Sequence, residues 1–292
     1  MTAKKVTRRG FLKFLGYGLI DLVILSMSGV LFDVLARKAL FSVDTIRLKL
    51  PRLPQAFSGL RVAQISDIHM GGWMNPERLQ QVADLVIAEK PDVLVITGDF
   101  LLGHDFSDAA KQAVVDMIPI LSSLAGSLPT FAVLGNHDYW TSPEAIRRML
   151  FSCGVKDLTN TVFTLHRDGS SLHLCGVDDI WKGDVRLNDV IAKLDNHSAA
   201  ILLAHEPDFA DTSAATGKFD LQISGHTHGG QVNLPFFGPP VRPYLGQKYP
   251  IGLYKIGNMY QYTNRGVGMA RLPLRVNCPP EITIFVLESG TS

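Results

Sequence analysis

Seven side chains with the chemistry of metal ligands follow short apolar runs of the sequence. Carboxylates, imidazoles and one amide make up the set, which consists of Asp67, His69, Asp99, Asn136, His205, His226 and His228. Mixed ligands of this kind suit Mn²⁺, Zn²⁺ or Fe, whereas an all-oxygen set would suit Ca²⁺ or Mg²⁺. These residue types therefore predict metal-assisted chemistry, and they are more numerous than a closed four-coordinate structural site needs.

The fragment Gly-His-Thr-His-Gly-Gly, residues 225–230, is the strongest single signal. Its histidines are one residue apart, and the flanking glycines let the backbone approach closely so that both imidazoles can point inward. The other fragments are weak alone, because Asp67 with His69, or Gly98 with Asp99, is more typical of a turn. His205 could simply end a strand. Together, in this order and each after an apolar run, the fragments are poorly explained by chance.

The elements that must position these side chains alternate in type after Pro54. Apolar runs of strand length alternate with segments of helical period, which predicts an α/β fold. Because ligand sites in α/β sheets gather at the carboxyl ends of strands, we expect the seven side chains in one region. The expected strands cover residues 60–65, 93–97, 130–134, 199–204, 221–224 and 281–287, and a helix covers residues 76–90.

The order of the fragments resembles the calcineurin-like metallophosphoesterase superfamily over about residues 58–288. The matching fragments are Asp67 with His69, Gly98-Asp99, Gly135-Asn136-His137-Asp138, His205 and Gly225-His226-Thr227-His228. The resemblance implies an α/β fold of two packed mixed β-sheets flanked by helices. Fragments of the tail resemble a bacterial branch of exported or membrane-associated enzymes, some of which are phosphodiesterases that act on UDP-2,3-diacylglucosamine. These tail fragments are Gly229-Gly230-Gln231, Gly252-Leu253-Tyr254, residues 265–268 and Pro280-Glu281-Ile282.

The resemblance also implies a role for each candidate residue. One divalent ion would be held by Asp67, His69 and His228, a second by Asn136, His205 and His226, and Asp99 would bridge the two. Two dications about 3.5–4 Å apart repel each other unless an anionic oxygen lies between them, which explains the carboxylate bridge. The ions would be Mn²⁺, Zn²⁺ or Fe. As the second catalytic residue beside Asp99, His137 would contact the phosphate and protonate the leaving alkoxide, since histidine titrates near neutral pH.

One position departs from the family pattern. Many relatives carry Gly-Asp-x-x-Asp, whose second Asp orients the catalytic histidine. Leu102 occupies that position here and cannot accept a hydrogen bond. We expect Asp138, His104 or Asp105 to take over this task, and without such a partner the acid role of His137 would be weaker.

The N-terminus matches an export signal. Residues 7–13, Thr-Arg-Arg-Gly-Phe-Leu-Lys, resemble the twin-arginine pattern, and an apolar stretch with a single charge, Asp21, follows over residues 14–32. Its length is close to the roughly 20 residues that span a bilayer, and the basic residues before it keep the N-terminus in the cytoplasm. We expect a signal or anchor helix over residues 1–40, a linker and entry strand over 41–57 and the catalytic domain over 58–288. The twin-arginine machinery would place that domain at the outer face of the cytoplasmic membrane, in the periplasm or at the cell surface.

Several functions share these motifs. The leading hypothesis is a phosphodiesterase or pyrophosphate hydrolase that acts on a lipid-linked or UDP-diacylglucosamine-like substrate. A phosphomonoesterase or nucleotidase could use the same site, whereas a non-catalytic scaffold predicts losses among the ligands or at His137, and none is seen. The net charge is +1 and no basic run occurs beyond the N-terminus, so no nucleic-acid partner is expected.

Glycine, proline and aromatic residues are dense over residues 234–262, which predicts a lid or hairpin region. Phe236, Phe237 and Tyr244 together with Arg242 would suit the boundary between acyl chains and phosphate head groups. In the alternative interpretation, the two phenylalanines cover a sheet edge as ordinary core.

Overall fold

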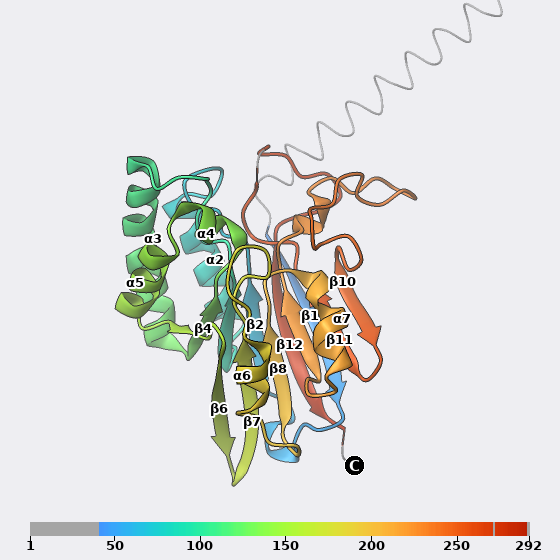
Figure 1. Ribbon diagram of the computed structural model, residues 1–292. Coiled ribbons are helices and arrows are strands. Elements are labelled where there is room, and N and C mark those ends of the chain that lie inside the picture. The colour runs from blue at the N-terminus through green and yellow to red at the C-terminus, as the bar shows by residue number, and fades with distance from the viewer. Residues whose placement is uncertain (1–40, 271, 291–292) are drawn as a thin grey trace, which may run out of the picture. The chain divides into compact units, whose positions relative to one another are not determined.

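Two six-stranded β-sheets pack against each other in the computed structural model, which describes residues 41–270 and 272–290 (Figure 1). In the first sheet four parallel strands follow one another, and β12 joins them antiparallel to β2 while β1 pairs parallel with β12. Its order is β1 (Ser42–Leu50), β12 (Glu281–Ser289), β2 (Arg61–Ile65), β3 (Val93–Thr97), β4 (Thr130–Val133) and β5 (Lys156–Asp157).

The second sheet has a parallel centre and antiparallel edges. The strands β7, β8, β9 and β11 are parallel, and β6 and β10 form antiparallel pairs with β7 and β11. Its order is β10 (Gly252–Ile256), β11 (Met259–Thr263), β9 (Leu221–Ser224), β8 (Ala199–Leu203), β7 (Ser170–Gly176) and β6 (Thr161–Arg167). The prediction of two packed mixed sheets flanked by helices is therefore confirmed.

Helices cover the outer faces of both sheets (Figure 1). The first sheet is covered by α2 (Pro76–Ala88), α3 (Asp108–Ser127) and α5 (Pro143–Cys153), and the second by α6 (Leu187–Ile191) and α7 (Ala210–Ala215). Short α4 (Asn136–Thr141) follows β4, and 3₁₀ turns occur at η1 (Gln55–Phe57), η2 (Pro207–Phe209) and η3 (His228–Gly230). None of the helices in residues 41–270 and 272–290 is long and apolar enough to cross a bilayer.

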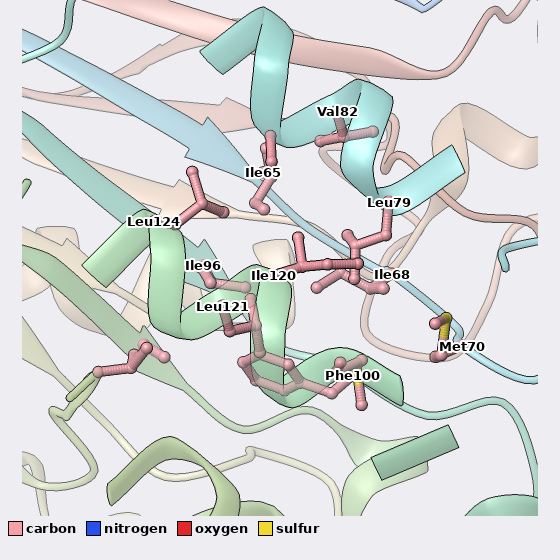
Figure 2. Close-up of a cluster of buried hydrophobic side chains, with 14 of the residues drawn as sticks. Ile65, Ile68, Met70, Leu79, Val82, Ile96, Phe100, Ile120, Leu121 and Leu124 are labelled. Atoms are coloured by element: carbon pink, nitrogen blue, oxygen red, sulfur yellow. The ribbon is translucent and has the colours of Figure 1, made fainter. Parts of the chain in front are cut away.

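Three apolar clusters hold the layers together. One lies between the sheets and includes Val95, Phe131 and Ile201; another lies between the second sheet and its helices. Figure 2 shows the cluster beneath α2 and α3, where Leu79 and Leu121 pack over the strands. Fully burying one such side chain contributes about 1.5–3 kcal/mol, so these clusters fix the strand ends that carry the polar residues.

Local sequence explains where α2 begins and ends. The side chain of Asn75 accepts a hydrogen bond from the backbone N–H of Arg78, and Pro76 occupies the first helical position. The helix ends at Ala88, two residues before the predicted end. Lys90 already has a left-handed backbone with φ of 50°, which a continuing helix cannot accommodate.

Strand β1 lies in the segment predicted as a linker and entry strand. It pairs with β12 over nine residues, from Ser42 opposite Glu281 to Leu50 opposite Ser289. Because β12 is antiparallel to β2, β1 begins at the edge of the sheet where β2 ends. The predicted signal or anchor helix over 1–40 lies outside the described residues.

Candidate metal centre

The structure brings all seven predicted ligand side chains to one end of the two sheets. They follow the carboxyl ends of β2, β3 and β4 in the first sheet and of β8 and β9 in the second. Each is at least nine-tenths buried: Asp67, His69, Asp99, Asn136, His205, His226 and His228. The expectation that these residues lie in one region therefore agrees with their placement.

Asp67, His69 and His228 form one close group. The Nε2 atom of His228 lies 3.3 Å from Oδ1 of Asp67, and Nε2 of His69 lies 3.9 Å from the same oxygen. The two Nε2 atoms are 2.9 Å apart, and the rings are stacked. Three ligand atoms therefore converge on one small space.

Asp99 lies between this group and the remaining histidines. Its Oδ2 atom is 3.5 Å from Nε2 of His69 and 3.3 Å from Nε2 of His205. Nδ1 of His226 lies 3.3 Å from Nε2 of His205. Asp99 thus contacts both His69 of the first group and His205, which in turn lies close to His226.

Backbone carbonyls orient three of the imidazoles. Nδ1 of His69 donates to Leu101 O at 3.2 Å, Nδ1 of His205 donates to Thr97 O at 2.6 Å, and Nε2 of His226 donates to Tyr244 O at 2.8 Å. Because a carbonyl can only accept, each of these ring nitrogens carries the proton. The opposite nitrogen of each ring then faces the centre, which is how protein histidines are oriented toward metal ions.

Asn136 supplies an oxygen that lacks a partner. Its Oδ1 atom is buried and has no hydrogen-bond partner among the described residues. Burying an amide oxygen without a partner costs about 1–3 kcal/mol, so native proteins seldom leave one unsatisfied. Together with the converging imidazoles and carboxylates, this oxygen fits a site for divalent metal ions.

The backbone is strained at five of the seven positions. Asp67, His69, Asp99, His226 and His228 all have φ between 49° and 71°. This left-handed region is uncommon for residues other than glycine and costs of order 1–3 kcal/mol in each case. Such strain persists where the surrounding structure fixes it, and here it aims the side chains at a common point.

Two glycines allow the segments to approach closely. A Cβ atom at Gly135 would collide with Oδ1 of Asp99, and one at Gly225 would collide with Oγ of Ser66 and Oδ2 of Asp67. The close approach at Gly225 also allows a backbone hydrogen bond, in which His226 N donates to the carboxylate of Asp67 at 3.0 Å. Gly135 therefore permits a close approach between the ends of β4 and β3, and Gly225 permits one between the two sheets, that any side chain would block.

Burial and charge set the protonation of the site. Burial would raise the pKa of Asp67, yet His228 and His205 hold it far below its usual range. Burial lowers the pKa of His69 to about 3 and that of His226 to about 4, so both rings are neutral at neutral pH. Burial would also lower the pKa of His205, but the charge of Asp99 raises it well above its usual value. Neutral imidazoles and ionised carboxylates are the forms that bind metal, so an ion bound at His205 would displace the proton that Asp99 favours.

His137 lies beside the ligands, and it is held by a backbone carbonyl. Its backbone N–H donates to Oδ1 of Asp99 at 2.9 Å, and its Nδ1 donates to Gly103 O at 3.1 Å. The hydrogen bond that holds this ring thus involves none of the three expected side chains, although the ring of His104 packs beside it at a centroid distance of 5.3 Å. Asp138 instead accepts hydrogen bonds from the backbone of Asp99, Phe100, Leu101 and Gly135 and ties β3 to β4.

Sequence reasoning missed a buried arginine behind the site. The Nη2 atom of Arg275 donates to the carbonyls of Arg265, Gly266 and Gly268 and lies 3.3 Å from Nδ1 of His228. Forty-seven residues separate Arg275 from His228, so no local spacing could have revealed the contact.

A cavity of about 380 Å³ opens above the candidate metal ligands. Asp99, Asn136 and His137 form part of its lining, and aromatic rings stand on its walls. Trp181 contacts the rings of Trp140 and Tyr244 at centroid distances of 5.0 and 5.3 Å. The two tryptophans were missed, because an isolated tryptophan gives no sequence signal, whereas Tyr244 lies in the region predicted as a lid or hairpin.

Comparison with known proteins identifies the class. The family model of the calcineurin-like phosphoesterases matches residues 60–230. Metallophosphoesterase YkuE of Bacillus subtilis (strain 168) is 34% identical over 98% of this chain and 99% of its own length. Phosphodiesterase YaeI of Escherichia coli (strain K12) is 31% identical over 84% of this chain and 88% of its own. Among solved structures, TT1561 of Thermus thermophilus aligns with a TM-score of 0.49 and 15% identity over 72% of this chain and 90% of that one.

The chain belongs to the calcineurin-like phosphoesterase family. It is a metallophosphoesterase, a hydrolase that acts on phosphoester bonds, and it carries a candidate metal site of Asp and His residues.

Proposed function

We propose that the protein is a phosphodiesterase that uses two divalent ions. Asp67, His69 and His228 would hold one ion, and Asn136, His205 and His226 the other. The observation that carries the proposal is the position of Asp99, whose Oδ2 lies within 3.5 Å of both His69 and His205. A carboxylate there is placed to contact both ions and to offset their mutual repulsion.

The residues around the proposed metal site would have different roles in the reaction. Bound divalent ions supply Lewis acidity and neutralise the charge that builds on the phosphoryl oxygens. His137 would contact the phosphate through Nε2, because its Nδ1 donates to Gly103 O, and in its doubly protonated form the ring would give the Nε2 proton to the leaving oxygen. The aromatic walls formed by Trp140 and Trp181 would exclude water from one side of the cavity.

Two observations favour diesters over monoesters. The cavity extends from the ligands to apolar walls, which leaves space for a second ester group beyond the phosphate. In addition, YaeI is named a phosphodiesterase, and it aligns with 84% of this chain. A phosphomonoesterase or nucleotidase with the same metal site is the competing function.

The proposed location is the outer face of the cytoplasmic membrane. The twin-arginine pattern at residues 7–13 and the apolar stretch at 14–32 support export, with the stretch either cleaved or kept as an anchor. A lipid-linked phosphodiester or pyrophosphate, such as a UDP-diacylglucosamine-like molecule, is the proposed substrate class. A membrane location would bring the cavity close to such molecules.

The test is a turnover screen of the metal-free and metal-reloaded protein. Bis-p-nitrophenyl phosphate, p-nitrophenyl phosphate and a lipid pyrophosphate would be compared with Mn²⁺, Zn²⁺ or Fe²⁺. The proposal expects chelation to abolish turnover, a divalent ion to restore it, and the diester or pyrophosphate to exceed the monoester in kcat/KM. A higher kcat/KM for the monoester would establish the competing function.

A further inference from the structure

Six large apolar side chains stand in solvent beside the mouth of the cavity. We call this surface the apolar rim, and it consists of Leu234, Phe236, Phe237, Val241, Tyr244 and Leu272. Phe236 is fully exposed and Phe237 is 84% exposed, so the interpretation of these residues as ordinary core was wrong. Exposed apolar residues that cluster in this way mark a contact with another surface.

The tip of the rim is a tight and strained turn. The backbone N–H groups of Phe237 and Gly238 both donate to Leu234 O, at 3.2 and 2.9 Å. Phe236 at this turn has φ of 69°, a conformation that is a genuine outlier for a bulky residue. The turn therefore holds two phenylalanine rings in solvent at a cost in free energy. The backbone of Phe236 is strained, and both apolar rings are exposed to water.

Hydrogen bonds join the two segments of the rim into one surface. Asn233 N donates to Val276 O at 2.9 Å, and Val276 N donates to Gln231 O at 2.9 Å. The side chain of Gln231 also donates to Leu272 O at 3.1 Å. In Figure 1 the orange segment before β10 extends beyond the ends of the strands. The phenylalanines and Leu272 thus belong to a single connected face.

The rim is continuous with the candidate site. Val241, Arg242, Pro243 and Tyr244 line the cavity together with the metal ligands. The carbonyl of Tyr244 accepts the hydrogen bond from His226. Anything that binds the rim therefore covers the mouth of the cavity.

Charge favours an anionic surface as the occupant. Residues 229–246 and 266–280 contain no Asp or Glu, and of their arginines Arg275 is buried while Arg242 is exposed. Arg242 is exposed between the aromatic residues of the rim. Aromatic side chains mixed with a cation suit the level of phospholipid head groups.

The position of the start of the described chain also supports a membrane as the binding partner of the rim. Ser42 N donates to Pro280 O at 2.8 Å, and Arg265 donates to Oγ of Ser42 at 2.9 Å, so β1 begins at the end of the sheets that carries the site. Eight residues separate Phe41 from the apolar stretch 14–32, and eight residues span at most about 30 Å. An anchor in that stretch would therefore be joined to the sandwich at the end that carries the candidate site.

We propose that the apolar rim inserts into the surface of an anionic phospholipid bilayer and holds the mouth of the cavity against it. This rests on the proposed function in its membrane location and names the partner of the same site. A phosphodiester carried by a lipid would then reach the metal ligands without leaving the bilayer.

The test uses the full chain in vesicles and reads insertion without turnover. Phe237→Cys is labelled with an environment-sensitive fluorophore, and Phe151→Cys, at an 87% exposed position on α5, is the matched control. The native cysteines are all buried, which favours labelling of the introduced thiol. In phosphatidylcholine–phosphatidylglycerol vesicles, the probe at 237 should shift to the blue and be quenched by spin-labelled lipid, while the probe at 151 should do neither. An unchanged spectrum at 237, or a change that follows protein concentration instead of lipid, overturns the proposal.

Activity gives an independent readout. The double variant Phe236→Ser/Phe237→Ser is compared with Phe151→Ser on phosphatidyl-p-nitrophenol in the same vesicles and on soluble bis-p-nitrophenyl phosphate. The ratio of turnover on vesicles to turnover on the soluble diester should fall at least about tenfold in the double variant alone. The reason is that this variant loses two aromatic side chains that would be buried in the bilayer. An unchanged ratio contradicts docking. Absence of turnover on the soluble diester in the unmodified protein would instead contradict the proposed function, and the fluorescence result would still stand.

Discussion

At the scale of single residues, the site depends on groups that orient its histidines. Backbone carbonyls fix His69, His205 and His226, and the carbonyl of Gly103 fixes His137. Leu102 occupies the position from which many relatives orient the catalytic histidine with a carboxylate. The carbonyl of Gly103 makes Nδ1 of His137 the donor without adding a negative charge near the candidate metal ligands.

The proposed acid role of His137 predicts a dependence on the leaving group. His137→Ala should reduce turnover of diesters with alkoxide leaving groups by about 100-fold or more, since general acid catalysis is worth that much. Turnover of a p-nitrophenyl diester should fall much less, because nitrophenolate leaves without a proton. Steady-state kinetics on both substrates provides the measurement, and equal losses would show that His137 only binds the phosphate.

The grouping of the candidate ligands could be predicted from the sequence because their identities lie in short contiguous fragments. Gly225–Gly230 and Gly135–Asp138 each place chemistry and close-packing glycines side by side. The groups that support these fragments could not be predicted. Arg275 meets His228 only through folding, and the hydrogen bond from His137 to Gly103 uses a backbone atom that every residue carries.

At the scale of elements, the strands that end at the site were predicted closely. Their cores, such as Val93–Thr97 and Ala199–Leu203, are fully buried runs without polar interruption. The hairpin of β6 and β7 was missed because β6 is only half-buried and mixes polar with apolar residues. Helix α3 was missed as well, although Ser107 caps its first turn, because Pro119 lies inside it and proline normally interrupts a helix.

The cap of α2 provides a prediction at this scale. Asn75→Ala should lower the free energy of unfolding by about 1 kcal/mol, because the N–H of Arg78 loses its acceptor. Asn75→Asp should keep the cap and change stability by only a few tenths of a kcal/mol. Denaturant unfolding monitored by circular dichroism gives both values. Equal destabilisation by the two substitutions would show that the side-chain cap does not stabilise this helix.

At the scale of the whole molecule, the site exists because two sheets end at the same place. Asp67, His69, Asp99 and Asn136 come from the first sheet, and the other histidines come from the second. Contacts cross between the sheets at this end: Gln64 donates to Ser224 O at 2.9 Å, and His205 donates to Thr97 O. The apolar layer between the sheets therefore sets the distances among the ligands.

Export by the twin-arginine route is a prediction for the intact chain. That route carries folded proteins, so the metal ions could be loaded before export. Replacing both arginines, Arg8→Lys with Arg9→Lys, should leave the protein in the cytoplasmic fraction of a bacterial host. Cell fractionation with immunodetection is the measurement, and normal export of the double variant would refute the twin-arginine interpretation.

The central claim is that two divalent ions share the carboxylate of Asp99. The most direct measurement is elemental analysis of the active protein and of Asp99→Asn, combined with diesterase activity on the same samples. The account predicts two ions per fully active chain. For the variant it predicts loss of at least one ion and a fall in activity of about 100-fold or more, because a neutral amide cannot offset the repulsion between the ions. Full activity with one ion or none per chain would contradict it.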